Sequence, residues 1–110
     1  MNAKAVFLTL GKGYIKKVNV NDIIFIEADS CYSKIHTIGE QHFISKTLKE
    51  LHEKIDSQLF YRISRSIIIN LNYLDFIKGA QLYLTNGKSF IIPRRKTRKI
   101  VNEISQVLLL

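Results

Sequence analysis

A short polar, cationic segment stands directly before an apolar run in the middle of the chain. Ser64, Arg65 and Ser66 precede Ile67–Ile69, a short β-branched block of the kind that forms a buried strand. An arginine guanidinium can fork onto a guanine edge, and hydroxyls and backbone amides can bind phosphate. The pattern predicts a small cationic tip held on a rigid strand. A lone arginine is more often an ordinary surface residue, so the rest of the chain must decide.

A second cationic cluster lies near the C-terminus. The segment 94–99, Arg-Arg-Lys-Thr-Arg-Lys, holds five cations in six positions and leads into a helical pattern marked by Ile100, Ile104 and Val107. Cations at a helix N-terminus oppose the helix dipole. An anion bound there would resolve the conflict, because free amides and positive side chains would converge on it. The alternative is a solvated lead-in to a helix that begins only near Thr97, and the sequence leaves both open.

Composition limits the functional class. A chain of 110 residues predicts one domain, and a net charge of +8 favours a polyanionic partner, nucleic acid first and an anionic membrane surface second. The single Cys31 excludes an internal disulfide and a cysteine-based zinc site, and indicates an intracellular protein. No apolar run reaches the ~18 residues of a membrane span, and Met1–Lys4 does not open a signal peptide.

The hydrophobic pattern predicts a mostly β chain with two helices, an α+β fold. A helix over about 48–56 begins at a capping box of Thr47 and Glu50, and its apolar face packs on a sheet. Asn86-Gly87 is the strongest hairpin signal. The predicted strands are Ala5–Leu10, Tyr14–Val20, Ile23–Ile26, Cys31–Ile38, Gln41–Ser45, Ile67–Ile69, Asp75–Lys78, Gln81–Leu84 and Lys88–Ile92.

Together these features resemble the LytTR family of bacterial DNA-binding domains, over about residues 6–104. The motifs that carry the resemblance are Ile23–Ala28, Tyr32, Leu48–Leu51, Phe60–Asn70 with its Arg62, Ser66 and Asn70 spacing, Leu84–Gly87 and Ile92–Arg95. This chain departs from the family's usual residues at two places, both at or beside expected base contacts. The family commonly has His-Arg-Ser where this chain has Ser64-Arg65-Ser66, and often Ser-Arg where it has Pro93-Arg94.

The resemblance implies an elongated antiparallel β fold that reads the major groove with loops. Carried onto this chain, the contacts fall in three places, the Asp29–Lys34 turn, the β-strand tip and the late cationic cluster. The DNA-binding residues are then Ser33, Lys34, Ser64, Arg65, Ser66, Arg94, Arg95, Lys96 and Arg98. Arg65 and Arg95 are predicted to contact base edges, and Lys34, Arg94, Lys96 and Arg98 to contact phosphates.

The family also implies partners. Its members usually bind paired imperfect repeats in double-stranded DNA and follow a phospho-receiver of a two-component phosphorelay, or another sensor domain. We therefore expect a cytoplasmic output domain of a transcriptional regulator, activated by dimerisation or local concentration on its site. No receiver domain, cofactor or metal is expected within these 110 residues.

Three rival interpretations stay open. An enzyme is disfavoured, because His36, His42 and His52 have no metal-ligand spacing, although His36 and His42 could meet across a hairpin. A single-strand or RNA binder would need its five tyrosines exposed along a basic groove. The apolar tail Val107–Leu110 could mark a membrane-surface or protein-interaction module.

Overall fold

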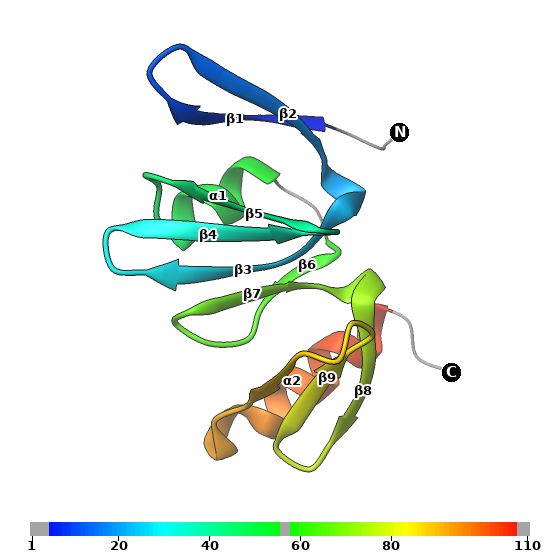
Figure 1. Ribbon diagram of the computed structural model, residues 1–110. Helices are drawn as coiled ribbons and strands as arrows, with labels where there is room; N and C mark the ends of the chain where they lie inside the picture. The colour runs from blue at the N-terminus through cyan, green and yellow to red at the C-terminus, as the bar shows by residue number, and fades with distance from the viewer. Residues whose placement is uncertain (1–4, 56–57, 108–110) are drawn as a thin grey trace. The chain divides into compact units, whose positions relative to one another are not determined.

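The computed structural model of the protein describes residues 5–55 and 58–107. Within these residues antiparallel strands dominate, with two α-helices and two short 3-10 helices, η1 and η2 (Figure 1). The elements are β1 (Ala5–Gly11), β2 (Tyr14–Asn19), η1 (Val20–Asp22), β3 (Ile23–Asp29), β4 (Tyr32–Thr37), β5 (Glu40–Ile44), α1 (Leu48–Ile55), β6 (Phe60–Arg62), β7 (Ile67–Asn70), η2 (Leu71–Tyr73), β8 (Leu74–Lys78), β9 (Gln81–Leu84), β10 (Ser89–Ile91) and α2 (Arg94–Val107). The predicted mostly β fold with two helices is confirmed.

The chain divides into two compact units, Met1–Asn70 and Leu71–Leu110. The first contains the β1–β2 hairpin, a five-stranded sheet of order β5-β4-β3-β7-β6 and α1; the second contains the three-stranded sheet β10-β9-β8 and α2. The expectation of one domain over residues 1–110 stays a prediction.

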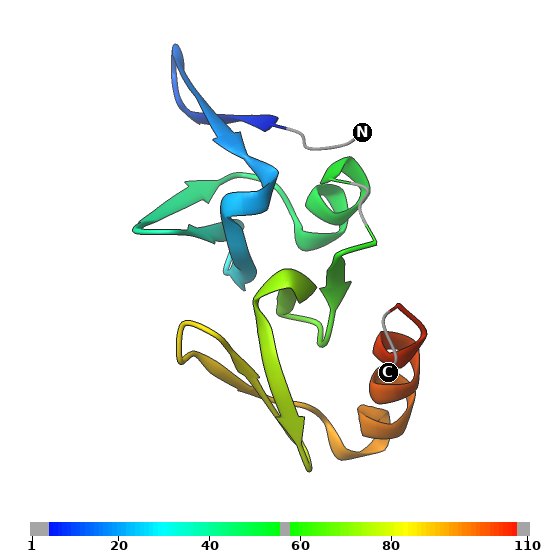
Figure 2. The ribbon, with the colours of Figure 1, turned by 90° about the vertical axis from the view of Figure 1, so that its right-hand side faces the viewer.

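The five-stranded sheet buries one face against α1. Ile26 pairs with both Ile35 of β4 and Ile68 of β7, which places their side chains on the same face. All three are essentially inaccessible to solvent, and they form one core with Leu48, Leu51 and Ile55 of α1. Figure 2 shows α1 on this side of the sheet. Burial at the centre of the sheet therefore explains why β3 begins with the continuous apolar run Ile23–Ile26.

The N-terminus of α1 is a reciprocal capping box, as predicted. Glu50 N–H donates to the Thr47 hydroxyl (3.1 Å), while the Thr47 N–H donates to the Glu50 carboxylate (2.9 Å). These hydrogen bonds, the backbone one foremost, lower the pKa of the Glu50 carboxyl below its ordinary value of 4.5. The helix is described as far as Ile55, so residue 56 of the prediction lies outside the described residues.

Asn70 joins β7 to the neighbouring strand β3. The residue is 1% exposed, and its side-chain amide donates to the carbonyl of Ile23 (2.9 Å). A buried amide needs such a partner, since an unpaired polar group in a core is costly. The asparagine that stood out in the sequence motif thus lies in the core of the first unit.

The second unit is a meander with a helix beside it. Tyr83 of β9 pairs with Phe76 of β8 and Ser89 of β10. The turn between β9 and β10 falls at the predicted Asn86-Gly87, where Gly87 has φ +91°. Leu82 and Leu84 are buried on one face of the sheet, and α2 lies beside it with Ile100 buried (Figure 2). The apolar segment 108–110 lies outside the described residues.

Candidate nucleic-acid interface

The loop between β6 and β7 has its backbone tied down on both sides. Arg62 donates from Nε to the Ser64 carbonyl (3.2 Å) and from Nη2 to the Arg65 carbonyl (2.9 Å). Ser66 N–H donates to the Ser64 hydroxyl (3.2 Å). The Ser66 carbonyl accepts from Ala28 N–H (2.9 Å) and so ties the loop to β3. Arg62, the first residue of the Arg62, Ser66 and Asn70 spacing, thus shapes the loop.

The side chains that this loop presents are those of Arg65 and Ser66. Both residues are exposed, whereas Ser64 is partly buried and its hydroxyl is used within the loop. The arginine therefore stands on a backbone held by hydrogen bonds and flanked by paired strands. A guanidinium fixed at its base in this way can approach a base edge or a phosphate without first ordering a loop.

The β3–β4 turn lies beside this loop at one end of the sheet. Glu27 pairs with Lys34 on one side and Ile67 on the other, so β3 leaves the sheet where β7 enters it. Figure 1 shows the β3–β4 turn and the β6–β7 loop at the same end of the sheet. Ser30, at the tip, has φ +59° and is exposed. Two of the three predicted contact segments thus share one edge of the first unit.

Ser33 does not lie on the surface. Its side chain is inaccessible to solvent, and its hydroxyl donates to the carbonyl of Lys46. The strand alternation that puts Ile35 into the core also puts Ser33 there. This burial speaks against the predicted contact between Ser33 and DNA and gives the residue a structural role, joining β4 to the end of β5.

Lys34 points to the opposite face and is partly exposed. Its ammonium lies 5.2 Å from the centre of the Phe43 ring, and Phe43 is 50% exposed. Such a contact weakly orients the lysine while leaving its charge available. Tyr32, at the start of the same strand, is 48% exposed and was not among the predicted contacts.

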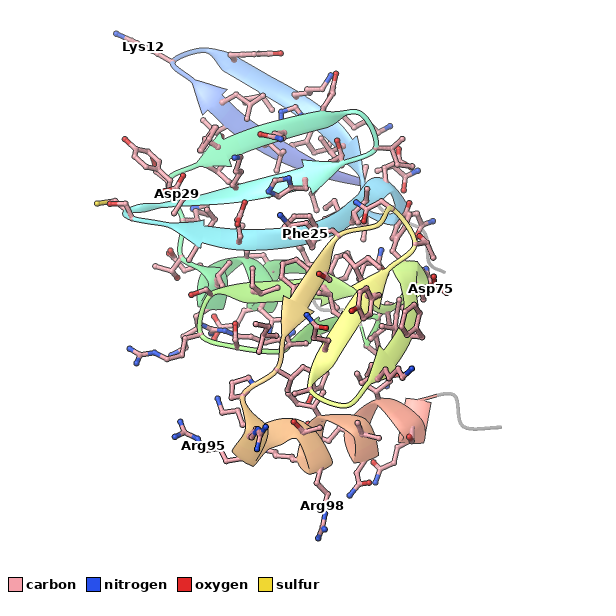
Figure 3. All side chains as sticks on the ribbon, turned by 60° about the horizontal axis from the view of Figure 1, so that its bottom comes forward. Lys12, Phe25, Asp29, Asp75, Arg95 and Arg98 are labelled. Carbon is pink, nitrogen blue, oxygen red and sulfur yellow. The ribbon has the colours of Figure 1, made fainter. Side chains whose placement is uncertain are left out.

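The third cationic segment forms the first turn and a half of α2. The helix begins at Arg94, so the alternative of a start near Thr97 is wrong. Pro93 precedes the first turn, and its carbonyl accepts from Lys96 N–H (2.9 Å) and the Thr97 hydroxyl (3.3 Å). No acidic residue lies in this turn. Arg94, Arg95 and Arg98 are exposed and Lys96 is partly so; Figure 3 shows Arg95 and Arg98 extending away from the helix.

The histidines do not form a site. The register pairs Ile35 with His42 and His36 with Gln41, so the two histidines lie on opposite faces, and the suggested meeting across the hairpin is wrong. His36 instead contacts Glu27 (2.7 Å) and stacks on Phe25. Within residues 5–55 and 58–107 no group of three potential metal ligands occurs, and no helix is long and apolar enough to cross a membrane.

Comparison with known proteins decides the family. The sequence model of the LytTr DNA-binding domain matches residues 13–105. The chain belongs to the LytTR family of DNA-binding domains. The match spans α1, the β6–β7 loop and the N-terminal turn of α2, and it begins inside the β1–β2 hairpin.

Similar proteins agree with this assignment. The LytTr DNA-binding domain of a Bacillus cereus protein described as a methyl-accepting/DNA response regulator has the same fold, with a TM-score of 0.75, 17% identity and coverage of 91% of this chain and 95% of that one. The CO-responsive transcriptional regulator RcoM of Rhodospirillum rubrum is 28% identical over 96 residues, 74% of this chain and 41% of that protein. An uncharacterized response regulatory protein of Vibrio cholerae is 28% identical over 75 residues, 64% of this chain and 29% of that protein. The chain thus spans less than half the length of these curated relatives.

Proposed function

We propose that this domain binds double-stranded DNA sequence-specifically, with strand-held loops in the major groove, as the output domain of a bacterial transcriptional regulator. The observation that carries the proposal is the β6–β7 loop, where Arg62 holds the backbone and Arg65 is exposed. Reading a base edge needs a bidentate donor at a fixed position. Membership of a DNA-binding family supports the same conclusion.

The cations divide by role. Arg65 and Arg95 contact base edges, because each is exposed at the tip of a structured segment. Lys34, Arg94, Lys96 and Arg98 contact phosphates, which orient the domain without reading sequence. Ser64 and Ser66 support the loop and its approach to the DNA backbone. The N-terminal end of the α2 dipole adds to the attraction for phosphate there.

The relatives' names support a regulatory context for this domain. One relative is a response regulatory protein and another a CO-responsive regulator, which supports a receiver or other sensor domain in the same protein as this output domain. We infer paired imperfect repeats as the target and a homodimer on DNA as the bound form. The domain does no chemistry itself and works in the cytoplasm, where the chromosome is.

A second candidate function is binding of single-stranded nucleic acid. Tyr14 and Tyr32 are about half exposed, and Lys34 lies over the exposed Phe43 ring. Exposed aromatics beside cations are the platform on which single-stranded bases stack. The duplex is favoured, because the exposed arginines of the loop and helix tips are suited to a groove and its phosphates.

The test is an in vitro selection from a randomised duplex pool, followed by binding of the winner and a scrambled duplex across a salt series. We expect a motif that binds ~10³-fold or more tightly than the scrambled duplex at physiological salt. Affinity that falls steeply with salt but shows no motif would instead indicate a general polyanion binder. Equal or tighter binding of the single strand would support the second candidate.

A further inference from the structure

The β1–β2 hairpin carries positive charge that the interface described above does not use. Lys12, Lys16 and Lys17 lie within residues 5–19, where there is no acidic residue. None of these three lysines has an ion pair or hydrogen bond to another described side chain. A hairpin with unpaired cations attracts an anion unless something else in the chain neutralises it.

The tip of this hairpin is built to hold Lys12 away from the protein. Gly11 and Gly13 flank the lysine, and Gly13 has φ +75°, a conformation that favours glycine. Tyr14 pairs with Gly11 across the turn and is 55% exposed. Figure 3 shows Lys12 extending outward from the turn. An exposed lysine and an exposed tyrosine therefore both belong to the end of a two-stranded arm.

The two faces of the hairpin differ. Leu8 and Val18 on the inner face belong to the buried core of the first unit, which anchors the arm. On the outer face Phe7 pairs with Lys17, and Phe7 is 68% exposed. The cationic tip is thus attached to a packed element, so its position relative to the five-stranded sheet is set by the core.

The tip shares an end of the first unit with the two contact segments described above. Figure 1 shows the β1–β2 turn, the β3–β4 turn and the β6–β7 loop on the same side of this unit. Gly11 of the first turn and Tyr32 of the second line one groove of about 820 Å³ between the hairpin, β5 and α1. A duplex that lies along these turns therefore brings its backbone toward the hairpin.

We propose that the tip of the β1–β2 hairpin, Lys12 with Tyr14 and supported by Lys17, is an additional DNA-backbone contact that binds phosphates flanking the base pairs read by the loops. The inference rests on the proposed function and extends its footprint. Lysine and tyrosine are both common phosphate donors. Lys12 and β1 precede the residues that the family model matches, whereas Tyr14 and Lys17 lie within them.

The experiment compares the wild type, Lys12→Ala and Lys49→Ala across a salt series. Lys49 is an exposed lysine on α1, and its replacement by alanine removes the same charge from a different element of the same unit. Each protein is measured on two duplexes, the selected site alone and the same site with flanks of about 10 base pairs, one helical turn, on both sides. The intact 110-residue chain is used throughout.

On the flanked duplex, Lys12→Ala should lower the slope of log affinity against log salt by about one, the effect of losing one phosphate contact. Lys49→Ala should leave that slope unchanged. On the duplex without flanks, Lys12→Ala should have the same slope as the wild type. On the flanked duplex, Lys12→Arg should have the full wild-type slope.

Three results would overturn the inference. They are an unchanged slope for Lys12→Ala on flanked DNA, the same loss on both duplexes, and the same loss for Lys49→Ala, which would indicate a general charge effect. Loss of binding to phosphatidylserine vesicles with unchanged DNA binding would assign the tip to a membrane surface instead. The in vitro selection with the wild type comes first. If the wild type selects no duplex motif, the proposed function fails and this inference fails with it.

Discussion

At the scale of single residues, Arg65 and Arg98 test the division between reading and positioning. Arg65 lies on the hydrogen-bonded loop and Arg98 on the exposed side of α2. We expect Arg65→Ala to cost about 1–3 kcal/mol on the selected duplex and to relax sequence preference. Arg98→Ala should weaken selected and scrambled duplexes by the same factor. Competition binding on both duplexes checks this, and equal losses in both variants would contradict the assignment.

Arg62 carries a different expectation, because its guanidinium faces its own loop. The guanidinium donates from two nitrogens to two carbonyls, those of Ser64 and Arg65. The ammonium of a lysine has a single nitrogen and does not reproduce this pair of hydrogen bonds. Arg62→Lys should therefore reduce the ratio of specific to scrambled binding while keeping the salt slope. If Arg62 instead contacted a phosphate, Arg62→Lys would keep the ratio as well as the slope, because lysine retains the positive charge. Binding to the selected and the scrambled duplex therefore separates the two roles.

At the scale of elements, the capping box of α1 predicts a stability effect with a defined pH dependence. Thr47→Ala should lower the free energy of unfolding by about 1 kcal/mol, the usual cost of losing an N-cap hydroxyl. The pKa of the Glu50 carboxyl is lower folded than unfolded, so its stabilisation is present above its ordinary value of 4.5 and is lost as pH falls through the lowered value. Denaturant unfolding at a series of pH values measures both effects.

The matched control for this cap is Glu53→Gln, an exposed glutamate on the same helix. Glu50→Gln should remove the acid-dependent part of the stability that the wild type loses below pH 4.5, whereas Glu53→Gln should not. If both variants kept the wild-type pH profile, the reciprocal hydrogen bonds would contribute nothing measurable in solution.

At the scale of the whole molecule, binding to paired repeats predicts a dependence on spacing. Two copies on one face of a duplex require repeat centres separated by about 10 base pairs or a multiple of that. Inserting about 5 base pairs, half a helical turn, should abolish cooperative occupancy, and inserting about 10 should restore part of it. Gel-shift titration across the spacing series checks this. Equal binding at every spacing would mean that the copies bind independently.

The α1 capping box and the β9–β10 turn were predictable, because each depends on residues close together in sequence. The pairing of β3 with β7 was not predicted, because it joins segments that lie far apart in the chain. The capping hydrogen bonds join residues three apart, and Asn86-Gly87 determines its own turn. The cationic segments were predictable as charged tips for the same reason. The sequence does not decide whether α2 begins at Arg94, since a proline followed by cations fits both a helical first turn and a solvated lead-in.

The sequence by itself determined the helices, the strands other than β6, the family resemblance and which segments carry charge, since these follow from local patterns. Only the tertiary structure decided what individual side chains do. It buried the side chain of Ser33 on the core face of β4, where its hydroxyl donates to the Lys46 carbonyl, and it turned the Arg62 guanidinium onto its own loop. It also placed His36 and His42 on opposite faces. The reason is physical: a side chain's exposure and partners depend on strand register and on which face the core covers, and both arise from contacts between residues far apart in the chain.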